Sequence, residues 1–241
     1  MLFYNWEFYL MGIILLPGLI FATYAQTLVT SRFKKFSKVP AKTGITACDL
    51  IRQLLDGCGL QHIKIVHTSG HLSDHYDPKN GEISLSNGVY NSNSIAALGI
   101  ACHELGHALQ KEKNYLPYRF RAFLIPVCNV ASSLLWPLVI IGLMFDFIIL
   151  NTSLGNIFIW AGVAFFGISV LLNLVTLPVE FDASRRAVQL LKGTGTLDDE
   201  ELKGTKSVLN AAALTYVAAL LVSILNFLRF VFYILINRSR D

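Results

Sequence analysis

Four long apolar stretches constrain the fold of this chain more than any other feature. They cover residues 9–29, 123–145, 157–177 and 209–236, and each is long enough to cross a bilayer, because about 20 apolar residues span its hydrocarbon core. A soluble domain normally carries about 25% charged residues, whereas this chain carries 15%. The sequence therefore predicts a mainly α-helical, multi-span membrane protein, for which the lipid bilayer is one expected partner.

The basic residues predict how the chain is oriented. The polar segments 31–121 and 178–208 hold 12 and 5 of the 20 Lys and Arg residues, and only Arg229, Arg238 and Arg240 lie elsewhere. Because basic segments favour the cytoplasmic side, both polar segments are expected there, with the N-terminus outside. The net charge of +4 is modest, and the basic residues cluster beside apolar stretches, so no nucleic-acid partner is expected.

The alternation of apolar and polar segments divides the chain into five expected parts. The first stretch has basic residues after it and none before it, which favours a retained anchor over a secretory signal peptide. The parts are an N-terminal transmembrane anchor (1–30), a cytoplasmic domain (31–121), a transmembrane hairpin (122–177), a second cytoplasmic segment (178–208) and a C-terminal transmembrane segment (209–241).

The first polar segment has the pattern of a small α+β domain. Residues 48–59 show helical spacing of leucine and isoleucine and end at glycine. Two short alternating runs, 62–67 and 82–86, predict strands, and the DPKNG turn at 77–81 predicts a β-hairpin or an edge strand pair. A further helix is expected over 94–112, where Asn and Ser residues offer N-caps.

Residues His103, Glu104 and His107 form an HExxH motif on this last predicted helix. Residues four apart lie above one another on a helix face, so both imidazoles can reach one ion at about 2 Å. The glutamate between them is placed to take a proton from a metal-bound water. Gly99 and Gly106 are expected to leave open space where a substrate backbone approaches. The motif predicts one catalytic Zn²⁺ ion held by His103 and His107, with Glu104 as general base.

Two related classes of metalloprotease do not match this motif's surroundings. The longer pattern HExxHxxGxxH requires glycine and histidine where this chain has Gln110 and Lys113. Intramembrane metalloproteases place HExxH within a spanning helix, whereas fewer than about 18 apolar residues surround this one. The helix is therefore expected at or above the membrane surface.

A catalytic zinc site needs a third protein ligand and an open fourth position. No histidine follows His107, so a carboxylate must serve. Glu112 is too close on the same helix, Asp146 is expected at the far membrane face, and the acidic run 198–201 is expected to be solvated. Glu180 and Asp182 remain as candidates, and if they continue a helix their side chains point about 200° apart, so only one can face the metal.

The stretch from His71 to Pro78 is also rich in chemically active side chains. Within it, His75 or Tyr76 is a candidate for stabilising a transition state or contacting a substrate. The alternative is that its Asp and His side chains only cap a turn.

Three segments carry a resemblance to a known family. HELGHALQ (103–110), DHYDP (74–78) and LPVEFDASRRA (177–187) resemble the YugP-like family of neutral zinc membrane metallopeptidases, and distantly the HtpX-type membrane proteases. The resemblance covers nearly the whole chain and implies a zinc-dependent endopeptidase with a small α+β, zincin-like core of the gluzincin type.

The Glu ligand of these families and the longer reach of a Glu side chain favour Glu180 as the third zinc ligand. Asp182 and Arg185 are then candidates for supporting the ligands, because Arg185 and Arg186 can pair with the carboxylate left out. Related proteases pair HExxH with an ExxxD motif, whereas this chain carries Ser184 four residues after Glu180. The carboxylate that orients a histidine in those enzymes is therefore not at its usual place.

The predicted function is a membrane-embedded zinc metalloendopeptidase that cleaves proteins or peptides, including membrane proteins. Its location is expected in the bacterial cell membrane, with the active site on the cytoplasmic side. The alternative is a non-catalytic membrane scaffold or chaperone, whose structural zinc would have four protein ligands. A transporter is disfavoured because few ionisable residues, chiefly Asp146 and Arg229, lie within the apolar stretches.

Overall fold

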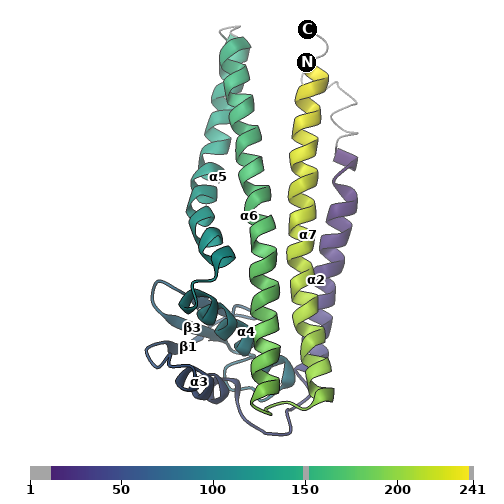
Figure 1. Cartoon of the computed structure of the whole chain (residues 1–241). Helices are drawn as coiled ribbons and strands as arrows, with labels where there is room; N and C mark the ends of the chain where they lie inside the picture. Colours follow the sequence, from purple (N-terminus) through teal and green to yellow (C-terminus); the bar gives the residue numbers. More distant parts are fainter. Residues whose placement is uncertain (1–11, 149–151, 239–241) are drawn as a thin grey trace. The chain divides into compact units, whose positions relative to one another are not determined.

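The computed structural model describes residues 12–148 and 152–238, which are mainly helical with one small sheet (Figure 1). The expectation of a mainly helical chain with a small α+β part is confirmed. The elements are α2 (Leu16–Phe36), α3 (Ala47–Gly57), β1 (Lys64–Thr68), β2 (His75–Asp77), β3 (Glu82–Ser86), α4 (Ile95–Glu112), α5 (Leu116–Ile148), α6 (Thr152–Gly193) and α7 (Asp199–Arg238).

The chain forms two compact units. The first, here called the apolar unit, comprises residues 1–24, 119–176 and 216–241. The second, the polar unit, comprises residues 25–118 and 177–215. Helices α2, α5, α6 and α7 contribute residues to both units.

Close contacts at glycines pack the helices of the apolar unit. A Cβ atom added at Gly18 of α2 would lie 2.8 Å from Leu225 Cδ1 on α7. Likewise, a Cβ atom at Gly162 of α6 would lie 3.1 Å from the ring of Phe230 on α7. The Phe166 and Phe230 rings also meet, with centroids 5.3 Å apart. These glycines allow α7 to approach both α2 and α6 closely.

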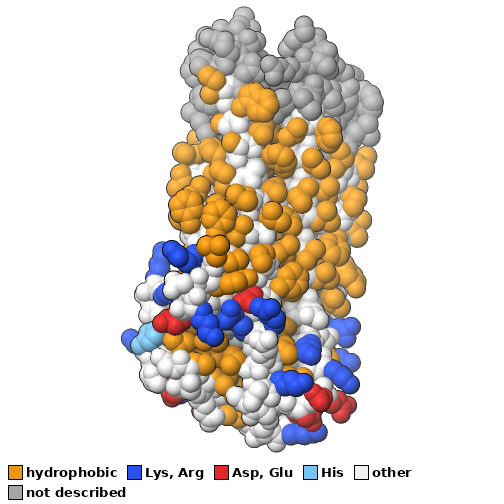
Figure 2. Space-filling view, viewed as in Figure 1, with side chains coloured by type: hydrophobic (Ala, Val, Ile, Leu, Met, Phe, Trp, Pro, Cys, Tyr) orange, Lys and Arg blue, Asp and Glu red, His pale blue; other side chains and the backbone are white. Residues whose placement is uncertain are grey.

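Within the residues described, Trp160–Gly193 of α6 and Asp199–Phe232 of α7 are long and apolar enough to cross a membrane, by length and composition. Only 17% and 28% of their most apolar windows are buried, whereas a soluble protein's core helix would be mostly buried. Figure 2 shows hydrophobic side chains over the apolar unit on the face in view. Membrane crossing by residues 9–29 and 123–145 stays a prediction, and residues 9–11 lie outside the described part.

The sheet of the polar unit has three strands in the order β1-β3-β2. Strand β1 pairs with β3 in parallel, and β2 pairs with β3 antiparallel, with Tyr76 opposite Ile83. The two predicted strands form and pair with each other, but in parallel, so the hairpin alternative for 62–67 and 82–86 is wrong. Asp77 accepts hydrogen bonds from the Lys79 and Asn80 backbone N–H groups, so the DPKNG turn joins β2 to β3. Strand β2 has three residues, too few for an alternating pattern to show.

The predicted helices of the polar unit form with the expected caps and core face. Ser94 is the N-cap of α4, and its hydroxyl accepts a hydrogen bond from the Ala97 N–H at 3.2 Å. Helix α3 buries its leucines and isoleucine as predicted. The hydrophobic core joins α3, β3, α4, α6 and α7 through Leu50, Ile51, Leu55, Ile83, Leu85, Leu98, Leu105, Ala187, Leu191, Val208 and Leu209.

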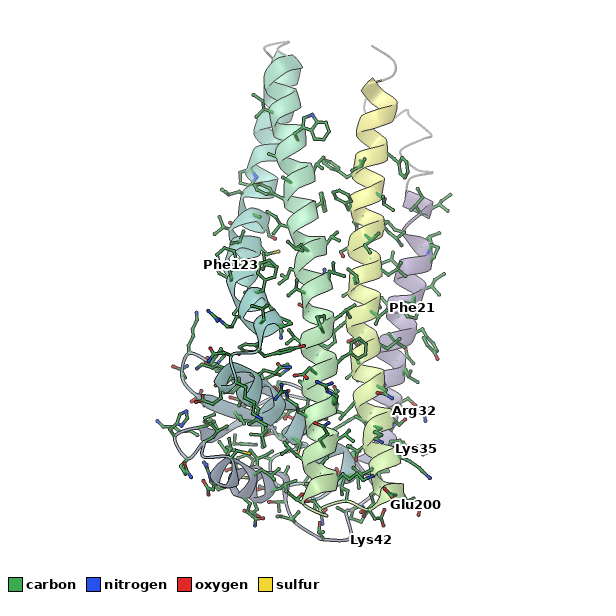
Figure 3. The ribbon with its side chains drawn as sticks, viewed as in Figure 1. Phe21, Arg32, Lys35, Lys42, Phe123 and Glu200 are labelled. Atoms are coloured by element: carbon green, nitrogen blue, oxygen red, sulfur yellow. The ribbon has the colours of Figure 1, made fainter. Side chains whose placement is uncertain are left out.

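The acidic run 198–201 is structured, not simply solvated as expected. The Asp198 carboxylate accepts hydrogen bonds from the Glu200 and Glu201 backbone N–H groups, and Glu201 accepts one from the Asp198 N–H. This reciprocal arrangement is a capping box at the start of α7. Glu201 also accepts the Lys42 backbone N–H at 2.8 Å. Figure 3 labels Lys42, beyond the end of α2, and Glu200 in the first turn of α7.

Candidate metal centre

Helix α4 presents both histidines of the HExxH motif on one face. Their spacing of four residues brings the rings of His103 and His107 to a centroid distance of 4.8 Å, edge to face. Glu104 follows directly in the same turn, and its side chain is buried. The motif therefore forms on a buried helix within the polar unit, as its spacing predicts.

Helix α6 brings Glu180 to these two rings. Its Oε2 atom lies 3.2 Å from His103 Nε2 and 3.6 Å from His107 Nε2, and the residue is only 2% exposed. Potential ligand atoms of the three residues all lie within 4.8 Å of one another. Two imidazoles and one carboxylate thus converge from two helices, and this is a donor set that zinc accepts in catalytic sites.

A glycine makes this convergence sterically possible. A Cβ atom added at Gly106 would lie 2.7 Å from the Ala183 carbonyl oxygen and 3.1 Å from its Cα. Gly99 likewise faces Thr205 of α7, whose Cγ2 would be 2.5 Å from an added Cβ. The expected open space beside both glycines is therefore wrong, because neighbouring helices occupy it. Gly106 instead lets α4 and α6 approach closely enough to share the site.

The second ring nitrogen of each histidine has its own partner. His103 Nδ1 lies 3.1 Å from the Ser184 hydroxyl, and His107 Nδ1 lies 3.0 Å from Gln110 Oε1. Such partners orient metal-binding imidazoles. Ser184 was recognised in the sequence only as a departure from ExxxD. In the sequence, Gln110 helps to rule out the longer zinc motif, and its place one helical turn after His107 is the only signal of this contact.

Asp182 belongs to a neighbouring polar network. Its carboxylate forms ion pairs with Arg185 and Arg186 and accepts a hydrogen bond of 2.9 Å from Gln110 Nε2. The same Gln110 nitrogen donates to the Val179 carbonyl at 2.7 Å. Asp182 is thus connected to His107 through Gln110, and its oxygens are engaged by donors from three side chains.

The electrostatics of the cluster favour a cation. Burial lowers the pKa of His107, but the hydrogen bond to Glu180 and the charges of Glu104 and Glu180 outweigh it, so the pKa lies above its ordinary value. The adjacent Cys102 is fully buried, and burial strongly raises the pKa of its thiol, which disfavours a thiolate ligand there. The residues present therefore fit a zinc ion bound by nitrogen and oxygen donors.

The His71–Pro78 stretch contributes differently. His75 is exposed, and its Nδ1 lies 2.9 Å from the Ser73 carbonyl. Tyr76 is half-buried below the Lys111 ammonium, and burial raises its pKa to about 12. Asp74 accepts hydrogen bonds from the Ser86 N–H and hydroxyl. Among the described residues, no hydrogen bond or ion pair joins His75 or Tyr76 to the three clustered donors.

Comparisons with known proteins agree with this chemistry. The family model described as "Putative neutral zinc metallopeptidase" matches residues 11–235. The chain is 42% identical over 219 residues to the "Putative membrane protease YugP" of Bacillus subtilis (strain 168), covering 90% of this chain and 93% of that protein. No solved structure matches. The predicted family is confirmed, and the chain belongs to this family of neutral zinc metallopeptidases.

Proposed function

We propose that this protein is a membrane-embedded endopeptidase that uses one zinc ion held by His103, His107 and Glu180. The observation that carries the proposal is the convergence of these three donors from α4 and α6 within 4.8 Å. Membership of a zinc metallopeptidase family supports the same chemistry. Bound zinc would lower the pKa of a coordinated water toward about 7 and polarise the scissile carbonyl.

Glu104 is the residue that we expect to transfer protons. Glu104 lies between the two histidines in sequence, close enough for its charge to raise the pKa of His107, and does not belong to the three-donor cluster. Its carboxylate accepts the proton of the attacking water and later donates it to the leaving amine. Its burial strengthens these electrostatic effects because the local dielectric is low.

The ligand count argues against a structural zinc in a scaffold or chaperone. A structural site is closed by four protein ligands, whereas the cluster found among the described residues has three members. Of the candidates for a fourth ligand, Asp74 is engaged by Ser86, and His75 is hydrogen-bonded to a nearby carbonyl. A zinc ion with three protein ligands keeps a fourth coordination position for water or substrate.

The proposal is tested by Glu104→Gln in the purified full-length protein. Zinc stoichiometry and the fold should remain, while the rate of casein cleavage should fall by about 10²–10⁴-fold, as expected on loss of a general base. Glu112→Gln is the matched control, because Glu112 is exposed at the end of the same helix, and it should leave the rate unchanged. Equal cleavage by Glu104→Gln and wild type would refute the mechanism.

The location that we propose is the cell membrane, with both polar segments on the cytoplasmic side. The two apolar helices and the relative's name as a membrane protease support membrane association. The uneven distribution of Lys and Arg supports the orientation. Proteins and peptides that reach this side, including membrane proteins, are the proposed substrates.

Thiol labelling tests this orientation. In a variant without native cysteines, Lys113→Cys should resist a membrane-impermeant thiol reagent in intact cells. Asn151→Cys, in the loop predicted between the second and third spans, is the control and should be labelled. Ready labelling at 113 with protection at 151 would reverse the orientation, and the zinc chemistry would be unaffected.

A further inference from the structure

Gln110 is a fully buried polar residue within the hydrophobic interior of the polar unit. Buried carboxamides require partners, and this one has three. Its Oε1 atom lies 3.0 Å from His107 Nδ1, and its Nε2 atom lies 2.7 Å from the Val179 carbonyl and 2.9 Å from Asp182 Oδ2. The side chain therefore connects the second motif histidine of α4 to two acceptors on α6.

These partners determine which way the carboxamide points. Its two ends have nearly the same shape, so only the hydrogen-bond network distinguishes them. The Val179 carbonyl can only accept, and the Asp182 carboxylate, paired with Arg185 and Arg186, also accepts. The NH₂ group must therefore face Val179 and Asp182, and the carbonyl oxygen must face His107.

The orientation of Gln110 decides the tautomer of His107. A carbonyl oxygen cannot donate, so His107 Nδ1 must carry the proton in this contact. In a neutral imidazole the other nitrogen then has a free lone pair, and Nε2 is the atom that lies 3.6 Å from Glu180. His103 differs, because its Nδ1 meets a hydroxyl that can either donate or accept.

We propose that Gln110 is a positioning residue that fixes the proton of His107 on Nδ1 and so presents Nε2 to the metal, while Asp182 and Val179 hold its carboxamide in place. Ser184 orients the His103 ring but leaves its tautomer to other partners. Metal-bound histidines usually donate to a carboxylate, a backbone carbonyl or water. Here the carboxamide oxygen of Gln110 accepts this hydrogen bond from His107. The inference rests on the proposed zinc site.

Zinc affinity tests the proposal. In detergent-solubilised full-length protein, competition with a chelating indicator should show that Gln110→Leu binds zinc about 10–100-fold more weakly than wild type, the usual cost of losing such a partner. Gln53→Leu is the matched control, because Gln53 is exposed on α3, and its zinc affinity should not change. A merely structural role would lower thermal stability and leave the zinc affinity of the folded variant unchanged, which would overturn the proposal.

A second measurement decides the matter if Gln110→Leu does not fold. Nitrogen NMR of zinc-loaded wild type labelled with nitrogen-15 histidine should show His107 protonated at Nδ1 and metal-bound at Nε2, assigned by the signals lost in His107→Gln. Binding through Nδ1 would overturn the proposal. If folded wild type binds no zinc, the proposed function itself fails. If zinc binds and Gln110→Leu matches wild type, only the role of Gln110 fails.

Discussion

The HExxH turn of α4 and the His71–Pro78 stretch are both rich in histidine and acidic residues, but the structure uses them differently. In α4, the Nε2 atoms of His103 and His107 face Glu180 of α6, a helix that is far away in sequence but adjacent in space. In the other region, the Asp74, His75 and Asp77 side chains contact backbone groups or the side chains of Ser86 and Asn80.

Both regions are dense in such side chains, but only the α4 region brings donors together from separate helices, while a role of His75 or Tyr76 toward a substrate stays a prediction. Asp77 lies two residues before the N–H group that it caps, whereas the His103–Glu180 contact joins positions 77 residues apart. Short-range contacts satisfy a turn. Convergence of donors from separate elements, with their other atoms already engaged, is what distinguishes the candidate metal centre.

The largest effect that we expect is from Glu180→Ala. Removing one of three ligands should weaken zinc binding by more than about 100-fold, since even an outer partner costs 10–100-fold, and should abolish casein cleavage. Metal analysis and zinc titration of the purified variant measure this.

The comparison variant for Glu180 is Asp182→Ala. It should lose at most about 10-fold in zinc affinity, because Asp182 reaches His107 only through Gln110 and outer partners cost 10–100-fold. If Asp182→Ala loses the metal and Glu180→Ala keeps it, the third ligand is Asp182. An equal loss of zinc affinity in both variants would mean that the carboxylates of Glu180 and Asp182 bind the metal as one unit.

A smaller effect is expected at the contact between α4 and α6. In Gly106→Ala, the new methyl group would meet the Ala183 backbone at 2.7 Å, and such overpacking costs about 1–3 kcal/mol of unfolding free energy. Zinc affinity should also fall, because the helices separate.

Gly193→Ala provides the control for this substitution. Gly193 ends α6 with nothing within 4 Å of an added Cβ, so it should be neutral or stabilising by up to about 1 kcal/mol. Urea unfolding in detergent compares the two variants. An unchanged free energy of unfolding in Gly106→Ala would show that the fold does not require the close approach of α4 and α6.

The smallest effect is expected in the His71–Pro78 region. His75→Ala and Tyr76→Phe should bind zinc as wild type does and change kcat/KM by less than about 3-fold, or under about 0.7 kcal/mol of transition-state stabilisation. The reason is that the described contacts of both side chains lie outside the three-donor cluster. Steady-state kinetics on a peptide substrate measure this. A loss of 10²–10³-fold in kcat, as on removal of a transition-state donor, would show that this region does act on the substrate.

Much of the site could be predicted because its signals are local. The HExxH spacing needs only one helix, and Ser94 and the leucine pattern of α3 define helices by short-range rules. The pairing of β1 with β3 was missed because the intervening strand β2 is too short to show alternation.

The supporting contacts could not be predicted in the same way. Gln110 touches Val179 and Asp182 across 69 and 72 residues, and Ser184 touches His103 across 81. The periodic spacing of apolar residues, which predicts helices and strands, does not reveal contacts between residues so far apart in sequence. Glu180 was preferred through family resemblance and side-chain reach, while geometry alone left Asp182 open.

The long separation between α4 and Glu180 has a consequence for the order of synthesis. A ribosome adds His103 77 residues before Glu180, and it adds Gln110 69 and 72 residues before Val179 and Asp182, the groups that hold it. Until then the nascent chain has two imidazoles and a glutamate but no third ligand. The three-donor cluster therefore forms only after residues 123–177 have been made and α6 packs against α4.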